Sequence, residues 1–219
     1  MPARPSPFLG TCDVIDWNHP DIVQLATELA REDILSTAEQ CFLFVRDEIR
    51  HSGDAECNPV TCSASEVLSH GTGFCYAKSH LLCALLRANR ISAGLCYQRL
   101  SLDGEGPPYC LHGLNAVQLP ETGWYRVDPR GNRPGIEAQF TPPVERLAFP
   151  ADRPGEYELP HVYAAPLPCV TRALRAHRDW SALSSALPDI DEDSQQPVHG
   201  QSPHSVPLTL DNPSRRSTT

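Results

Sequence analysis

Cys75 stands where a thiol is most easily converted into a nucleophile. It follows the glycine-rich stretch 71–73 and begins an apolar pattern that predicts a helix over about 75–89. The N-terminus of a helix carries partial positive charge, which lowers the pKa of a cysteine thiol. Of the nine cysteines in the chain, only Cys75 lies at a glycine-rich junction between a loop and a helix. This placement predicts attack of a thiolate on a carbonyl carbon.

Such a nucleophile needs a base, and the base needs an acid that orients it. His112 lies in the predicted strand 111–119, and Asp128 ends the next predicted strand, 124–128. A carboxylate on a neighbouring strand can fix the imidazole tautomer and stabilise the imidazolium. We therefore predict that Cys75, His112 and Asp128 form a catalytic triad.

The register of the two strands decides whether this triad can form. A plain hairpin that pairs Leu119 with Trp124 sets Asp128 opposite Asn115. That position is about 10 Å along the strand from His112, too far for a hydrogen bond. A bulge or a tighter turn must therefore bring the carboxylate to the imidazole.

The elements that position these residues are predicted from hydrophobic periodicity. Four segments show helical spacing: about 20–31, 36–50, 75–89 and 168–187. Ser63 and Glu66 fit a capping box that opens a short further helix. Three segments are predicted as strands, namely 91–97, 111–119 and 124–128. Helices followed by antiparallel strands predict an α+β fold, with N-terminal helices packed on an antiparallel sheet.

The chain is predicted to form one catalytic domain over 1–187, followed by a disordered tail over 188–219. The tail is rich in Pro, Ser, Gln and Asp and has almost no aromatic residues. Such a composition buries too little apolar surface to order a segment. Truncation after Leu187 is therefore expected to leave the melting temperature nearly unchanged.

Three sequence blocks carry a family resemblance. Residues 73–89 contain Gly-Phe-Cys followed by Ala-Leu-Leu-Arg-Ala, residues 112–117 read His-Gly-Leu-Asn-Ala-Val, and residues 123–129 read Gly-Trp-Tyr-Arg-Val-Asp-Pro. In this order they resemble the blocks of small bacterial-type proteins of the transglutaminase-like superfamily. The resemblance implies a papain-related α+β fold, a Cys–His–Asp triad, and thioester chemistry that ends in hydrolysis or in transfer to an amine.

These observations predict a cysteine hydrolase or acyltransferase whose acyl donor is a peptide, a protein or a small amide. Hydrolysis is favoured over crosslinking because water is always available and no amine-binding site is evident. The chemistry needs no metal or organic cofactor. The N–H group of Cys75 can stabilise the oxyanion, and a side chain such as Gln40 or His51 is a candidate second donor. The oligomeric state is left open.

Two other hypotheses compete with the enzyme. The same fold can serve as a catalytically silent binding or scaffolding domain. Alternatively, four side chains with irregular spacing can form a structural zinc site: His51, Cys57, Cys62 and His70.

Charge and composition exclude several partners. The formal net charge of −9 argues against nucleic acid and against an anionic membrane, both of which attract clustered Lys and Arg. No segment reads as a secretory signal or a membrane span, so a cytoplasmic location is expected. In that reducing compartment the cysteines are expected to be thiols, with three in the core: Cys41, Cys83 and Cys96.

Overall fold

The computed structural model describes residues 6–190 and 205–208. The helices in this part of the chain are η1 (Pro7–Leu9), α1 (Pro20–Leu29), α2 (Ile34–Glu48), α3 (Ser52–Ala55), α4 (Ala64–His70), α5 (Cys75–Ala88), α6 (Pro168–Ala176) and α7 (Trp180–Ser184). The strands are β1 (Arg50–His51), β2 (Thr72–Gly73), β3 (Ala93–Ser101), β4 (Tyr109–Leu119), β5 (Gly123–Val127), β6 (Tyr157–Glu158), β7 (His161–Tyr163) and β8 (Ser205–Pro207).

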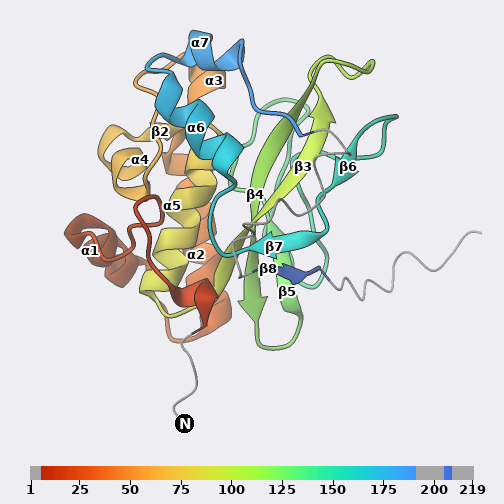
Figure 1. The fold of residues 1–219 in the computed structure, drawn as a ribbon. Coiled ribbons are helices and arrows are strands. Elements are labelled where there is room, and N and C mark those ends of the chain that lie inside the picture. Colours follow the sequence, from red (N-terminus) through yellow and green to blue (C-terminus); the bar gives the residue numbers. More distant parts are fainter. Residues whose placement is uncertain (1–5, 191–204, 209–219) are drawn as a thin grey trace, which may run out of the picture.

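The helices form one layer and the larger sheet forms the other (Figure 1). The sheet has the order β5-β4-β3-β7-β8, with β6 also paired to β3, and its pairings are antiparallel. A separate pair, β1 and β2, is parallel and lies within the helical part of the chain. Helices packed on one antiparallel sheet confirm the predicted α+β fold.

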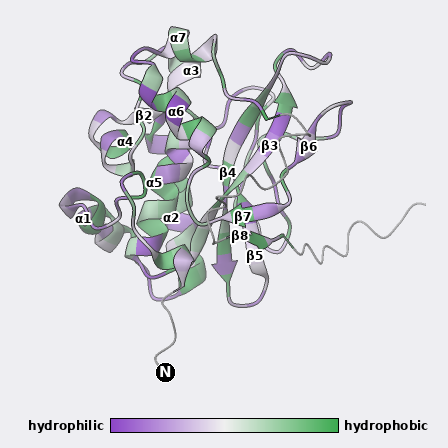
Figure 2. Ribbon diagram, in the orientation of Figure 1, coloured by the Kyte–Doolittle hydropathy of each residue, from purple (hydrophilic) through white to green (hydrophobic). Residues whose placement is uncertain are grey.

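Helix α5 is the centre of the core. Its apolar residues Leu81, Leu82, Leu85 and Leu86 are all 0% exposed, and the helix is coloured as largely hydrophobic in Figure 2. It packs against α2, α1 and α4 on the helical side and against β3 and β4 on the other. Because the helix is enclosed on both sides, its first residue is held rigidly relative to the sheet.

The turn between β4 and β5 resolves the problem of register. It pairs Leu119 with Gly123 rather than with Trp124, and Gly123 adopts a left-handed φ of 70° that favours glycine. The pairing of Asn115 with Val127 places Asp128, by extension, beside Leu114. The tighter turn expected as one of two alternatives is thus present: it shifts the pairing by one residue and brings Asp128 to the same face of the sheet as His112.

One other expectation fails, because a short polar signal outweighs the hydrophobic periodicity. The helix predicted over 168–187 is divided into α6 and α7, because His177 is extended and Asp179 caps a new helix by accepting a hydrogen bond from the N–H of Ala182.

The tail predicted to be disordered is described only in part. Residues 188–190 and 205–208 contact the sheet, the latter through the antiparallel pairing of β8 with β7. These contacts are made by backbone groups and by one aspartate, which composition does not reveal. The rest of the predicted tail lies outside the described residues.

Candidate active site

The N-terminus of α5 delivers Cys75 to the face of β4. The helix begins directly after β2, and its N-cap Phe74 gives no side-chain hydrogen bond, so it leaves the first-turn N–H groups without a side-chain cap. Gly73 is required just before it, because an added Cβ would lie 3.1 Å from Ala77 Cβ and 3.2 Å from Thr61 Oγ1. The predicted capping box of Ser63 and Glu66, one helix earlier, is confirmed.

His112 and Asp128 form a short buried ion pair. The Nε2 atom of His112 lies 2.7 Å from Oδ2 of Asp128, and the two side chains are 5% and 0% exposed. Asp128 also accepts hydrogen bonds from the N–H groups of Arg130 and Ala148, each 3.1 Å long. The ring of Phe149 meets the imidazole edge-on, with centroids 5.0 Å apart. The imidazole is thereby fixed with Nε2 toward the carboxylate and Nδ1 left for Cys75.

The thiol of Cys75 is the third member of the predicted triad. Its side chain hydrogen-bonds to His112, and its sulfur accepts a hydrogen bond from the N–H of Gly113 at 3.5 Å. Gly113 allows this approach because an added Cβ would lie 3.0 Å from Tyr76 Cδ1 and 3.1 Å from Tyr76 Cα. The three side chains predicted from the sequence therefore converge in the folded chain.

The electrostatics favour a thiolate beside an imidazolium. Burial raises the pKa of Cys75, but the imidazoles of His112 and His51 outweigh burial and lower it to about 6. Burial lowers the pKa of His112, but Asp128 and Cys75 raise it to about 10. Burial also opposes ionisation of Asp128, yet His112 and two backbone N–H groups hold the pKa of its carboxyl below the ordinary value. Near neutral pH the sulfur carries negative charge and the imidazole carries positive charge.

The structure places the two candidates for the second oxyanion donor, His51 and Gln40, in different surroundings. The side chain of His51 hydrogen-bonds to Cys75, and the imidazole meets the ring of Phe74 with centroids 5.6 Å apart. The side chain of Gln40 instead accepts a hydrogen bond from Arg31 at 3.1 Å in an exposed position. Only His51 lies at the thiol.

The four residues of the zinc hypothesis do not assemble into a metal site. His51 lies beside Cys75, and the Cys57 thiol donates to the carbonyl of Ala55 at 3.2 Å. Within residues 6–190 and 205–208, no three His, Cys, Asp or Glu side chains are grouped so that they could hold a metal ion. All nine cysteines are free thiols, and the three expected in the core are buried.

Lys78, one turn along α5 from Cys75, has no counterpart in the sequence predictions. It is 0% exposed, and its ammonium donates to the carbonyls of Arg46 and Ile49 at the end of α2. Burial and the nearby Arg130 guanidinium lower its pKa to about 7. The side chain ties the end of α2 to the helix that carries the nucleophile. A single lysine in an apolar pattern gave no signal of this role.

A short segment after α7 crosses from the helical layer to the sheet (Figure 1). The N–H of Leu111 donates to the carbonyl of Pro188 at 2.7 Å, and Arg99 binds both carboxylate oxygens of Asp189 at 2.7 Å. The hydroxyl of Tyr157 donates to the carbonyl of Ile190 at 3.0 Å. We refer to residues 188–190 as the strap. It lies next to His112, and Cys75 is only 7% exposed.

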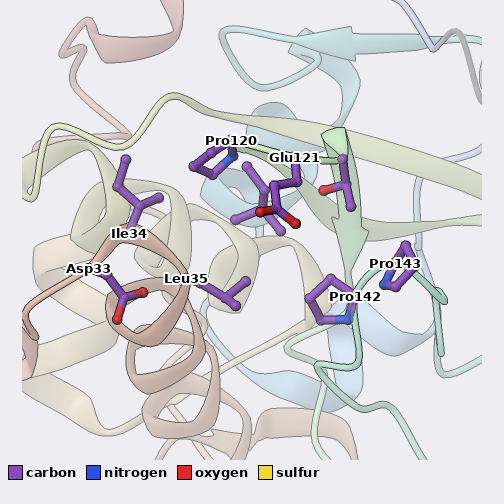
Figure 3. A pocket seen from close by; sticks show the side chains of 9 residues that line it. Asp33, Ile34, Leu35, Pro120, Glu121, Pro142 and Pro143 are labelled. Carbon is purple, nitrogen blue, oxygen red and sulfur yellow. The ribbon is translucent and has the colours of Figure 1, made fainter.

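An apolar cleft of about 690 Å³ lies elsewhere, at the opposite end of β4 (Figure 3). It is lined by the start of α2, by the β4–β5 turn and by two prolines, among them Ile34, Leu35, Pro120, Glu121, Pro142 and Pro143. None of the three triad side chains lines it. The chemistry predicted for the chain therefore does not take place in this cleft.

The comparison with protein families decides what kind of domain this is. Residues 23–129 match the family model described as "Transglutaminase-like superfamily". The matched residues, just under half of the 219-residue chain, are similar to this superfamily. The match contains Cys75 and His112 and ends one residue beyond Asp128. No curated protein matches the sequence.

Solved structures of low identity resemble the transglutaminase-like fold of this chain. A protein from Cytophaga hutchinsonii, provisionally described as a cysteine protease, is 18% identical, with a TM-score of 0.45, over 57% of this chain and 41% of its own. The periplasmic domain of TgpA from Pseudomonas aeruginosa is 22% identical, with a TM-score of 0.40, over 56% of this chain and 45% of its own. The chain thus spans less than half the length of these neighbours.

Among the described residues, no helix combines the length and the apolar character that crossing a lipid bilayer requires.

Proposed function

We propose that the transglutaminase-like domain is a cysteine-nucleophile enzyme that transfers an acyl group through a thioester. The observation that carries the proposal is the convergence of Cys75, His112 and Asp128, with a 2.7 Å contact between the last two. A thiolate–imidazolium pair is the form in which a cysteine attacks a carbonyl at neutral pH. A carboxylate behind the imidazole stabilises its positive charge.

The reaction has two halves. The sulfur of Cys75 forms a bond to the carbonyl carbon of an amide, and the C–N bond breaks as His112 gives its proton to the leaving amine. In the second half, neutral His112 takes a proton from water or from a second amine, which attacks the thioester and restores the thiol. Because the same nitrogen gives and then takes the proton, one imidazole serves both halves.

The acyl donor is proposed to be a peptide, a protein or a small amide, and water is proposed as the main acceptor. Hydrolysis is preferred to crosslinking because it needs no second binding site. Adding methylamine to the reaction distinguishes the two. A product that carries methylamine in place of a free carboxylate would show transfer, whereas an unchanged yield of carboxylate supports hydrolysis.

A cytoplasmic location is part of the proposal, since nine free thiols suit a reducing compartment. Fractionation of cells that express the full chain tests it. Recovery in an oxidising compartment would contradict it.

The nucleophile is tested by alkylation of the native full chain with iodoacetamide at pH 7, followed by peptide mapping. Cys75 is expected to react roughly tenfold faster than Cys12 and Cys57, because its thiolate is far more populated. Both comparison thiols are more exposed than Cys75, so accessibility alone predicts the opposite order. If Cys75 reacts no faster than they do, the silent scaffolding domain becomes the better description.

The acyl donor is sought by mass spectrometry of protein recovered from lysate. An added mass on Cys75 that is absent from Cys75→Ala identifies the acyl group. His112→Asn is expected to lower its yield, because acylation would lose the imidazolium that sustains the thiolate and protonates the leaving amine.

A further inference from the structure

A charged side chain outside the triad is held on a rigid turn in the loop that follows Asp128. Arg133 begins the turn Arg133-Pro134-Gly135-Ile136, in which the N–H of each end residue donates to the carbonyl of the other, at 3.1 and 2.8 Å. Proline followed by a glycine with a positive φ, here 83°, is typical of a type II turn. The turn therefore holds the backbone of Arg133 in one position.

The rest of this loop is fixed as well, and it borders a depression of the surface. The side chain of Asn132 accepts a hydrogen bond from the N–H of Ala138 at 2.8 Å and donates to the carbonyl of the same residue at 3.3 Å. The side chain of Arg133 is 53% exposed. The depression measures about 610 Å³ and is lined by Asn132, Arg133, Gly135, Ile136 and Glu137. A ligand from solvent can therefore reach the guanidinium.

Asp54 connects Arg133 to the elements that carry the nucleophile. The guanidinium of Arg133 lies 3.7 Å from Oδ1 of Asp54, and Oδ2 of Asp54 lies 3.6 Å from Nδ1 of His51. β1 pairs with β2 in parallel, so that His51 lies opposite Gly73, two residues before Cys75. Arg133 is thus placed at the edge of the candidate active site and not on a remote face.

The positive charge of Arg133 is only weakly balanced at this edge. Arg130 binds both oxygens of Asp54 at 2.7 and 2.8 Å, a bidentate arrangement that engages the carboxylate fully. Arg133 makes one longer contact with the same carboxylate. Glu137, which lines the depression, accepts a hydrogen bond from the side chain of Gln139. One carboxylate thus serves two guanidiniums, in a chain whose formal net charge is −9.

We propose that Arg133 binds a carboxylate of the acyl donor, so that the enzyme prefers an acidic peptide to a neutral one. The contact with Asp54 is longer than a hydrogen bond and leaves the N–H donors of the Arg133 side chain available to a ligand. The planar guanidinium matches the two oxygens of a carboxylate. A rigid backbone reduces the entropy that binding would cost. The inference rests on the proposed function and names the class of its substrate.

The matched probes are two p-nitrophenyl esters with the same number of acyl carbons. The monoester of adipic acid ends in a carboxylate, whereas the ester of hexanoic acid ends in a methyl group. With both, the sulfur of Cys75 forms a bond to the acyl carbon, the C–O bond breaks and p-nitrophenolate leaves, and water then releases the acid. The rate with Cys75→Ala is subtracted. The ratio of kcat/KM for the adipate to that for the hexanoate measures the preference for negative charge.

Arg133→Gln and Arg133→Lys test the guanidinium. In Arg133→Gln the ratio is expected to fall about tenfold, because a hydrogen-bonded pair of charges is lost. In Arg133→Lys, which keeps the charge without the planar fork, it is expected to fall by only a few-fold. Both variants are expected to keep the melting temperature of wild type, because the side chain is half-exposed. If Arg133→Gln does not fold, the comparison of Arg133→Lys with wild type carries the test.

Arg31→Gln is the matched control, since it changes the net charge of the chain by the same amount. Arg31 is exposed and follows α1 closely. The carbonyl of Ala26 in α1 accepts a hydrogen bond from Asn89, the residue that ends α5 at the opposite end from Cys75. The ratio is expected to be unchanged in this variant.

Each outcome decides the inference. A fall of the ratio in Arg133→Gln but not in Arg31→Gln supports it. An equal fall in both variants would overturn it, because the preference would then come from the field of the whole protein. A ratio unchanged by Arg133→Gln, or a wild-type ratio that does not favour the adipate, would also overturn it. If wild type turns over neither ester faster than Cys75→Ala does, the proposed function fails and the inference fails with it.

Discussion

Cys75 and Cys83 lie on the same helix, about two turns apart, and the core encloses both. Burial raises the pKa of the Cys83 thiol, which donates to the carbonyl of Ala93 at 3.4 Å and remains protonated. Burial opposes ionisation of Cys75 as well, yet its pKa falls to about 6 because two imidazoles face it. The difference between the two thiols therefore comes from their neighbours and not from their depth.

Two other buried thiols, one in α2 and one in β3, also have raised pKa values, as Cys83 does. Burial raises the pKa of Cys41 and of Cys96 to about 12 in each case. A buried cysteine in this protein is inert unless an ionisable partner meets it. Four experiments test how far this contrast holds, beginning with the largest expected effect.

Replacing each of the two helix thiols in turn tests the contrast directly. Cys75→Ala is expected to reduce acylation by p-nitrophenyl acetate nearly to the uncatalysed background, because the thiol that faces His112 would be lost. Cys83→Ala is the matched control, and its rate is expected to be unchanged, with a stability loss of about 1 kcal/mol for the small cavity. Acylation that persists in Cys75→Ala and disappears in Cys83→Ala would invert the assignment.

Removing the carboxylate of Asp128 tests whether this group keeps His112 protonated. Asp128→Ala is expected to lower acylation about 10²–10⁴-fold, since His112 would lose both its charge partner and its fixed orientation. Asp128→Asn is expected to lose less, because an amide oxygen still accepts the Nε2–H of His112. The rates are compared at matched folded fractions, measured by circular dichroism. Equal rates in wild type and Asp128→Ala would remove Asp128 from the mechanism.

The pH dependence of alkylation tests whether the Cys75 thiol has a lowered pKa, in contrast to the Cys83 thiol. A lowered pKa keeps the Cys75 thiolate populated above about pH 6, and protonation removes it as the pH falls through that value. The rate at Cys75 is therefore expected to drop about fivefold between pH 6 and pH 5. In His112→Asn the inflection should move upward, toward the ordinary thiol value of about 8.5. An inflection near that value in wild type would mean that no ion pair forms.

Shortening the chain tests the strap and gives the smallest expected effect. Truncation after Leu187 removes the bonds to Leu111, Arg99 and Tyr157 and also the pairing of β8 with β7. Together these contacts contribute roughly 1–2 kcal/mol, so the melting temperature should fall by about 3–6 °C. Truncation after Leu208 retains every described contact and is the control. An unchanged melting temperature after the first truncation would restore the expectation drawn from composition.

The sequence predicted the helices that have a periodic apolar face and the residues that belong to the three family blocks. Helices α1, α2 and α5 carry continuous apolar faces, and the three family blocks supplied Cys75 and its two partners. The sequence required a bulge or a tighter turn before Asp128 but did not distinguish the two, because one residue more or less in a turn changes every pairing without changing the hydrophobic pattern. The register could not be settled from periodicity alone.

The surroundings of the site were less accessible to sequence reasoning. β1 and β2 are two residues long, too short for any periodicity, yet their pairing is what places His51 beside the thiol. Asp54 and Arg130 meet across 76 residues of chain, and nothing in their spacing announces the contact. Such pairs exist only after the core around α5 has formed.

Lys78 is the single lysine among the 219 residues of this sequence, and it is enclosed completely. No ε-amine is therefore presented at the surface of the described chain. If the sulfur carries an acyl group, no lysine of the described residues is exposed to receive it. A lysine acceptor for such a group is then to be sought on a different protein.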